Sequence, residues 1–244
     1  YEIPERDRVL KGVPIVNIRP IQKDERICAI LVAADMDMEA EVVMVTALGS
    51  IKRTELKNFR NIVRTGIIAC TLEQSDEVIS ARLTTGSTRI IVAARSGKAI
   101  IFPTDQVRVM GRQAAGVRAI KLDDGDAVVG MDVITGDDDM VINLTEYGFG
   151  KKTPVGKYPV QNRAGKGVYT VHITKKTGDL VGIRVVKDTD ELMLISSSGQ
   201  IIRMPVSQIR TTRTRSTQGV RAIRMKEDEK IVDFTKYVNE EDAE

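Results

Sequence analysis

Tryptophan is absent from this 244-residue sequence, and aromatic residues (4%), cysteine (two) and histidine (one) are scarce. Two cysteines cannot form the disulfide framework of a small secreted domain, and both Cys28 and Cys70 stand in apolar runs where buried free thiols are expected. One histidine and no zinc-like cysteine spacing argue against a metal centre. No apolar run reaches the roughly 18 residues that span a bilayer, so we expect no membrane contact and a cytoplasmic location.

The chain is rich in charge, which is distributed in blocks. Charged residues make up 29% and hydrophobic residues 42%, a globular composition, and the net charge is only +3. Residues 107–121, 151–166 and 203–226 contain lysine and arginine but no carboxylate, whereas residues 123–139 contain seven aspartates and no base. Such segregation predicts surfaces of opposite sign.

A glycine-led line of eight residues recurs about every fifty residues. Its members are KGVPIVNI (11–18), TGIIACTL (65–72), AGVRAIKL (115–122), KGVYTVHI (166–173) and QGVRAIRM (218–225). The fourth and sixth residues after each glycine are apolar and the fifth is polar, which is the period of a half-buried strand. The regular spacing predicts a repeat architecture.

A second line recurs out of phase with the first and is typical of a β-hairpin. It comprises VVMVTALGSIKR (42–53), IIVAARSGKAII (90–101), MVINLTEYGFGKK (140–152) and LMLISSSGQIIR (192–203). Each has an aliphatic run, a polar turn with glycine and a second extended run. One further short strand follows each glycine line, so each unit has about four strands, and prolines interrupt the segments that could otherwise be helical.

Four-stranded units at this period predict an all-β, propeller-like fold of about five blades in a single domain, residues 1–238, followed by an acidic tail, 239–244. The signatures of the WD40 and kelch propellers are absent. The chain has five glycine lines but four hairpins, and it begins at Tyr1. This phase predicts that at least one upstream hairpin belongs to a longer parent protein.

The basic residues fall in the connectors, the segments between each hairpin and the next glycine line. Equivalent positions in a radial repeat lie at one radius and height, so repeated cations predict a continuous basic rim that can bind DNA phosphates. Aromatic side chains on which bases could stack are nearly absent there, which favours binding of duplex DNA over single strands. Any sequence preference should then come mainly from how easily the DNA bends. The candidate DNA-binding residues are Lys52, Arg53, Arg60, Arg64, Arg112, Lys151, Lys152, Lys157, Arg163, Lys166, Arg203, Arg213 and Arg215.

The sequence QNRAGKG at 161–167 resembles the basic seven-residue box, QRRGGKG, of the C-terminal domain of bacterial DNA gyrase A. Gln161, Arg163, Gly165, Lys166 and Gly167 match that box, whereas Asn162 and Ala164 depart from it. The resemblance extends over essentially the whole chain through EIPERDRVLKGVPIVN, YGFGKKTPVGKYP and STQGVRAIRM. It implies a β-pinwheel, a six-bladed propeller variant whose neighbouring blades share strands, here without its first blade.

The resemblance also implies a function. Duplex DNA would be bent around the basic perimeter, so that the holoenzyme, an ATP-dependent type IIA topoisomerase, introduces negative supercoils. The fragment itself would be non-catalytic and without cofactor, since ATP, Mg²⁺ and the catalytic residues would belong to the catalytic core and to gyrase B. No phosphate-binding glycine loop occurs in the sequence. The related C-terminal domain of topoisomerase IV is the alternative within the same superfamily.

Two other classes of function stay open. A propeller can serve as a protein-binding scaffold, or it can hold an enzyme site at its axis, although the repeats predict aliphatic residues there. His172 is expected to be an ordinary surface residue, and Asp137–Asp139 a solvated turn and not a cation site. The acidic tail is either a solubilising segment or a phosphate mimic that competes for the rim.

Overall fold

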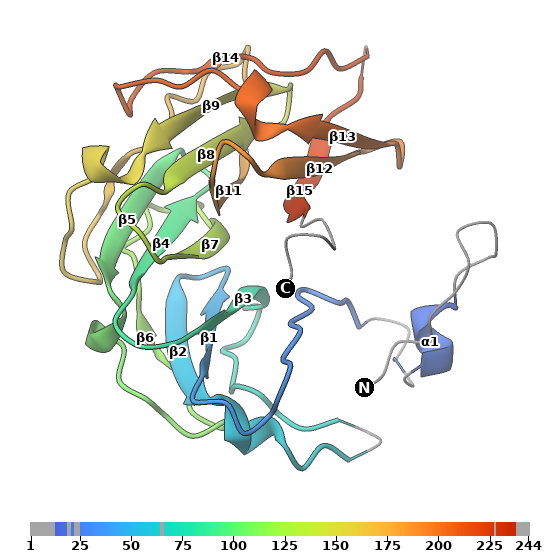
Figure 1. The fold of residues 1–244 in the computed structure, drawn as a ribbon, viewed down its shortest axis with the longest axis vertical. Helices are drawn as coiled ribbons and strands as arrows, with labels where there is room; N and C mark the ends of the chain where they lie inside the picture. Colours follow the sequence, from blue (N-terminus) through green and yellow to red (C-terminus); the bar gives the residue numbers. More distant parts are fainter. Residues whose placement is uncertain (1–12, 19–20, 22–24, 64–65, 227, 238–244) are drawn as a thin grey trace.

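The computed structural model describes residues 13–18, 21, 25–63, 66–226 and 228–237. Four β-sheets follow one another in an open arc, from the first, in blue, at the bottom of Figure 1 to the last, in orange and red, at the top right. We call these sheets blades 1 to 4 in chain order. The predicted all-β, propeller-like class is confirmed. No helix among the described residues is long and apolar enough to cross a membrane.

Each blade is built on an antiparallel hairpin with a glycine in its turn. The hairpins are β1–β2 (Glu41–Thr46, Ser50–Glu55), β4–β5 (Arg89–Ala94, Lys98–Pro103), β8–β9 (Met140–Thr145, Phe149–Pro154) and β12–β13 (Glu191–Ser196, Ile201–Pro205). Gly97 has a φ of +85°, and a Cβ there would stand 2.4 Å from the carbonyl oxygen of Val171. Both the turn conformation and the close approach therefore require glycine.

An inner strand completes each blade on the side of the centre. These strands are β3 (Val78–Thr84), β7 (Val128–Ile134), β11 (Leu180–Val186) and β15 (Ile231–Tyr237), and each pairs antiparallel with the first strand of its hairpin. Neighbouring inner strands contact each other along the arc. The blades therefore stack on one another through their inner strands.

Outer strands of only two residues link each blade to the next. They are β6 (Val117–Arg118), β10 (Val168–Tyr169) and β14 (Val220–Arg221). The chain reaches β6 after completing hairpin β4–β5 of blade 2, yet β6 pairs with β2 of blade 1; β10 and β14 return in the same way to β5 and β9. This exchange between neighbouring blades is the strand sharing that the resemblance to the gyrase A C-terminal domain implied.

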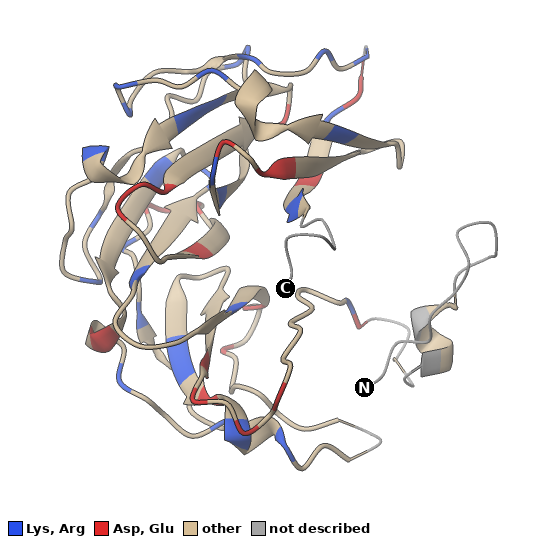
Figure 2. Ribbon diagram, in the orientation of Figure 1, with Lys and Arg blue, Asp and Glu red and all other residues tan. Residues whose placement is uncertain are grey.

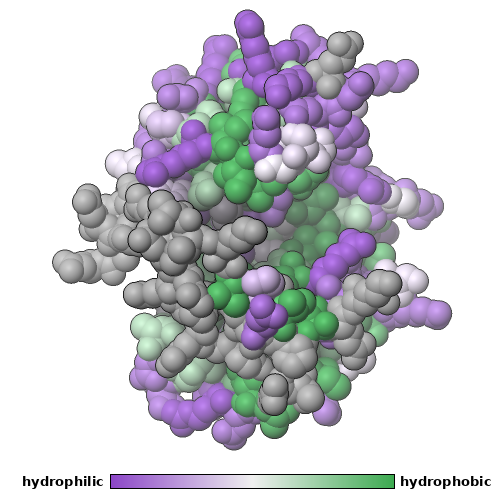
Figure 3. All heavy atoms as spheres, turned by 90° about the vertical axis from the view of Figure 1, so that its right-hand side faces the viewer, coloured by the Kyte–Doolittle hydropathy of each residue, from purple (hydrophilic) through white to green (hydrophobic). Residues whose placement is uncertain are grey.

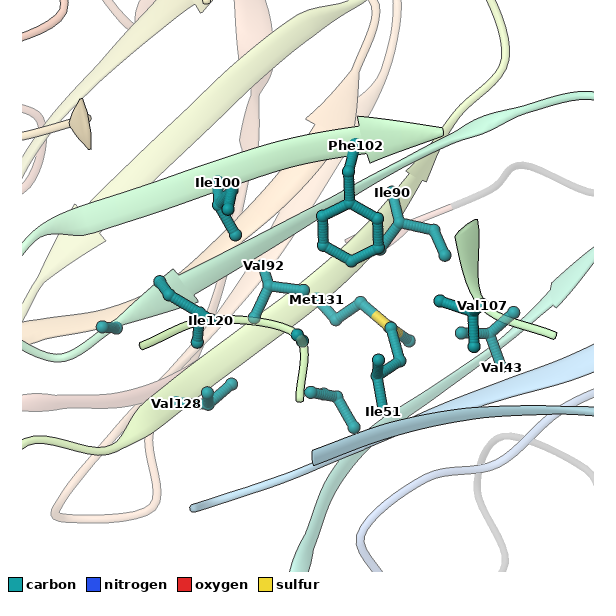
Figure 4. Packing of buried hydrophobic residues seen from close by; sticks show 13 residues of the cluster. Val43, Ile51, Ile90, Val92, Ile100, Phe102, Val107, Ile120, Val128 and Met131 are labelled. Carbon is teal, nitrogen blue, oxygen red and sulfur yellow. The ribbon is translucent and has the colours of Figure 1, made fainter. Parts of the chain in front are cut away.

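The hydrophobic core lies between adjacent blades. Figure 4 shows Val43 and Ile51 of blade 1 packed with Ile90, Phe102 and Met131 of blade 2. All five are almost completely buried. Burial of each such side chain stabilises the fold by roughly 1.5–3 kcal/mol, so the order of the blades is fixed by packing as well as by strand exchange.

The structure corrects the predicted number of blades. The described residues form four sheets instead of about five, and the fourth has three strands in the order β13-β12-β15. An outer strand forms only where a glycine line meets the hairpin of the preceding blade. The lines at 115–122, 166–173 and 218–225 each find such a hairpin, whereas residues 66–72 form no strand and residues 15–18 form a short helix, α1 (Ile15–Ile18).

The centre of the arc is polar, contrary to the predicted aliphatic axis. The inner strands place Arg82, Asp132 and Arg184 around a cavity of about 620 Å³, and Arg82 Nε donates to Asp132 Oδ1 over 3.0 Å. Desolvation by burial lowers the pKa of Arg184. Seen from the open side of the arc, the surface is hollowed between the first and last blades (Figure 3).

Candidate nucleic-acid interface

Short 3-10 turns start the connectors, and the connectors after the second, third and fourth turns cross the outside of the preceding blade. The turns are η1 (Leu56–Phe59), η2 (Thr104–Gln106), η3 (Val155–Lys157) and η4 (Val206–Gln208). Backbone N–H groups of Met110, Gln161 and Thr212 each donate over 2.8 Å to a carbonyl of the second hairpin strand beneath, at Arg53, Ile101 and Lys152. Three successive connectors are therefore seated identically.

The glycines that begin the glycine lines permit this close contact between connector and hairpin. Gly116, Gly167 and Gly219 all have positive φ, and a Cβ on them would stand 2.6, 2.5 and 2.7 Å from a backbone oxygen of the neighbouring hairpin strand. Any side chain would push the outer strand away from its partner, so the glycine that marks each repeat is a requirement of backbone contact.

Neighbouring connectors are also bonded to one another. The N–H of Lys121 donates to the carbonyl of Gly165 over 2.8 Å, and the N–H of His172 donates to Thr217 over 3.2 Å, at the equivalent place one blade further. We call the surface formed by residues 107–121, 157–173 and 207–224 the basic belt. Figure 2 shows several of its lysines and arginines on the convex side of the arc.

The belt carries little compensating negative charge, and Asp123, just beyond its first segment, is the carboxylate that acts on Lys121 and Lys166. Its sequence contains no carboxylate, and among the described residues none of its lysines or arginines forms an ion pair. The exposed members are Arg108, Arg118, Lys121, Lys157, Lys166, Arg210, Arg213, Arg221 and Arg224. A row of exposed, unpaired cations is the surface that a polyanion requires.

Six of the thirteen candidate residues lie on this belt. Lys157, Lys166 and Arg213 are exposed, whereas Arg112, Arg163 and Arg215 are half-buried and tie connectors together. Arg112 donates to the Ile68 carbonyl over 2.9 Å, and Arg215 to the Tyr169 carbonyl over 3.3 Å. Arg163 donates through Nε to the Gln106 carbonyl over 3.0 Å and through a terminal nitrogen to the Arg118 carbonyl over 3.1 Å.

Three of the predicted DNA-binding lysines are buried, so they do not belong to the exposed surface of the belt. Lys52, Lys151 and Lys152 are exposed by only 2%, 0% and 3%. Strands β2 and β9 are covered on both faces, by the core and by a connector, so lysines on them have no path to solvent. Lys152 Nζ donates to Asp188 Oδ1 over 2.5 Å and to the Val206 carbonyl over 3.1 Å.

Three further candidates are neutralised by carboxylates. Arg53 is paired with Glu41 over 3.1 Å, Arg60 with Asp37, and Arg203 with Glu191. A phosphate would have to displace an existing partner at each of these sites, so they are poor first contacts for DNA. Arg64 and the acidic tail, 239–244, lie outside the described residues.

The outer strands supply cations that the connector-based prediction missed. Arg118 and Arg221 are the second residues after their glycines, Lys121 and Arg224 the fifth, and all four are exposed. The equivalent residues of the intervening repeat, Tyr169 and His172, are exposed too. The repeat could have revealed these cations, because the second and fifth residues after each of these three glycines are polar or aromatic and exposed.

The aspartate turn at 137–139 is held by the protein's own groups. Asp139 is buried and accepts hydrogen bonds from the N–H groups of Thr135 and Gly136, over 3.0 and 2.9 Å, while Asp137 pairs with Arg89 over 2.6 Å. Within the described ranges no group of three or more histidine, cysteine, aspartate or glutamate residues could hold a metal ion.

A propeller whose neighbouring blades exchange their outer strands is a β-pinwheel. The family model for the DNA gyrase C-terminal domain, β-propeller, matches residues 40–85, 88–135, 139–187 and 190–236, one match for each blade. The chain therefore belongs to the DNA gyrase C-terminal domain family.

Similar proteins agree with this assignment. The chain is 40% identical to DNA gyrase A of Staphylococcus epidermidis and 39% identical to that of Salmonella typhimurium, over 99% and 100% of its length. It spans 27% and 28% of those relatives.

Among solved structures, the C-terminal domain of DNA topoisomerase IV superposes with a TM-score of 0.84 at 27% identity, covering 92% of this chain and 70% of that one. A gyrase A C-terminal domain gives 0.84 at 24% identity, covering 94% and 76%, which supports the fold.

Proposed function

We propose that the chain is a non-catalytic domain that binds duplex DNA and bends it around the basic belt. The observation that carries the proposal is the repetition of one seating geometry in three connectors, which lines up exposed, unpaired cations from Arg108 to Arg224. Smooth bending of 20–30 base pairs costs on the order of 1–6 kcal/mol, and several simultaneous phosphate contacts can offset it.

Within a gyrase, such a domain would present a bent DNA segment to the catalytic core and to gyrase B. The ATP and Mg²⁺ chemistry and the strand passage would belong to those parts. Membership of the gyrase C-terminal domain family and the 40% identity to DNA gyrase A of Staphylococcus epidermidis support this role. The likeness to a topoisomerase IV C-terminal domain supports the alternative that the chain is the corresponding domain of a topoisomerase IV.

A salt titration tests DNA binding. Fluorescence anisotropy measures the binding constant for duplexes of unrelated sequence, and its logarithm should fall linearly with the logarithm of the salt concentration. The slope should be about −0.9 for each phosphate contacted, or about −5 for about six contacts. Reversing two exposed belt residues, Arg118→Glu with Arg221→Glu, should weaken binding to all sequences and flatten the slope.

The matched control is Lys187→Glu, because Lys187 is exposed and unpaired but lies in the turn between β11 and β12, off the belt. It should change affinity far less than Arg118→Glu or Arg221→Glu alone, each of which reverses one charge as the control does. Equal losses from the control and from the belt would contradict a defined DNA path. Binding that does not depend on salt would contradict the proposal altogether.

A further inference from the structure

Two buried lysines occupy equivalent places in alternate blades. Lys52 on β2 and Lys151 on β9 are each the third residue after a hairpin glycine, and they are exposed by 2% and 0%. The same place holds isoleucine in the other two blades, at Ile100 and Ile202. Burial of an ammonium ion destabilises the folded state unless the ion is fully hydrogen-bonded. Lysines at these two buried places are therefore expected to have a specific structural role.

Both ammonium groups are bonded to the connector above them. Lys52 Nζ donates to the carbonyls of Gly111 and Arg112, over 3.0 and 2.5 Å, and to Ala69 over 2.8 Å. Lys151 Nζ donates to the carbonyls of Thr214, over 2.9 Å, and Arg215. Neither makes an ion pair, and each ammonium group gathers two backbone carbonyls at the bend of the connector, of which Gly111 also accepts the N–H of Ala114 and Thr214 also accepts the hydroxyl of Thr212.

Blade 2, which has Ile100 in place of the buried lysine, packs its connector differently. Over Ile100 the connector is the glycine box, in which a Cβ on Gly165 would stand 3.3 Å from Ile100 Cδ1. The isoleucine beneath thus goes with Gly165 in the bend, whereas the bends over Lys52 and Lys151 have Ala114 and Ser216 at the same distance after the seated residue.

We propose that Lys52 and Lys151 are positioning residues for DNA binding: each holds the bend of one connector so that the arginines of that connector keep their places on the basic belt. The inference rests on the proposed DNA-binding function. Lys151 acts through Arg213 and Arg215, and Lys52 acts through Arg112 and its neighbour Arg108. The charged or titratable groups that act on the two lysines are Arg215 at Lys151, and Cys70 and Arg112 at Lys52.

A double-mutant cycle in duplex binding tests the link between Lys151 and its arginines. Lys151→Met should lower affinity about tenfold at 0.1 M salt and flatten the log–log salt slope by up to about 1.8, the share of two phosphate contacts. In an Arg213→Gln, Arg215→Gln background the same change should cost less than twofold. The control Lys187→Met removes one positive charge off the belt and should be additive with the arginine changes.

The outcomes separate the proposals. If the wild-type domain binds duplex with a steep salt slope but Lys151→Met loses no more than Lys187→Met, or its loss adds fully to that of the arginine changes, the positioning role is refuted. If the wild type shows no salt-dependent binding, the proposed function itself fails. Should Lys151→Met unfold, as judged by its thermal transition, Lys52→Met with Arg108→Gln and Arg112→Gln provides the same cycle in blade 1.

Discussion

Replacing Ala164 with glycine should stabilise the domain. Ala164 has a φ of 66°, in the left-handed region that residues with a Cβ avoid, and it stands in the box at 161–167. Its N–H donates to the Ala119 carbonyl over 2.6 Å, which holds it in this conformation and joins two connectors. The strained backbone of Ala164 therefore destabilises the domain, while the hydrogen bond that it makes joins two connectors of the belt.

The magnitude follows from two opposing effects. The left-handed conformation costs a residue with a Cβ roughly 1–2 kcal/mol, and the greater freedom of glycine in the unfolded chain offsets roughly 0.5–1 kcal/mol of that. The net gain from Ala164→Gly should be about 0.5–1 kcal/mol. For a chain of this size that corresponds to a rise of about 1–4 °C in Tm.

Chemical denaturation of Ala164→Gly measures this gain, and Ala115→Gly is its control. Ala115 is exposed, lies next to the equivalent bend one blade earlier and has no positive φ, so glycine there should destabilise by roughly 0.4–1 kcal/mol. If the two variants moved stability in the same direction, the conformational argument for the box would be refuted.

Two further changes probe the seating of the belt. Gly167→Ala should destabilise by more than about 2 kcal/mol, because its Cβ would stand 2.5 Å from the Ala99 carbonyl oxygen at a φ of +69°, whereas Gly156→Ala, with open space around it, should be nearly neutral in the same urea titration. Burial, followed by the charge of Arg215, lowers the pKa of Lys151 from 10.5 to about 8. The unfolded chain then binds the extra proton between pH 8 and 10.5, so stability should rise with pH across that window, by on the order of 1–2 kcal/mol after allowance for screening, and Lys151→Met should lack this rise. An identical pH dependence in both proteins would contradict the assignment.

Local patterns in the sequence were sufficient to predict the repeat and the hairpins, whereas the strand sharing was implied only by the resemblance to the gyrase A C-terminal domain. The glycine that begins each line is needed for backbone contact, so its spacing reports the architecture directly. The alternation after it predicted a half-buried strand, but only Val117–Arg118 and its counterparts are strands, and the residue that follows each of them donates to the glycine carbonyl of the neighbouring hairpin turn. Strand length depends on the edge available in the neighbouring blade, which no local pattern encodes.

The orientation of the lysines could not be predicted in the same way. Lys151 and Lys152 stand in an unbroken basic block, and alternation on a strand places one of them on each face. Both faces of β9 are covered, so neither lysine reaches solvent, whereas Arg118 and Arg221 do. The polar centre of the arc around Arg82 and Asp132 could not be predicted for a related reason. A single charged residue on an inner strand does not indicate a polar centre until the four inner strands are brought together.

Bending of DNA around the basic belt can be measured directly from the distance between the two ends of a bound duplex. End-to-end energy transfer in a duplex of about 30 base pairs, labelled at both ends, should increase when the wild-type domain binds. The increase should be lost when Arg118, Arg221 and Arg224 are changed to glutamate, and kept when Lys187 is. A duplex that binds tightly yet stays straight, or one that bends equally on the charge-reversed belt, would contradict the account.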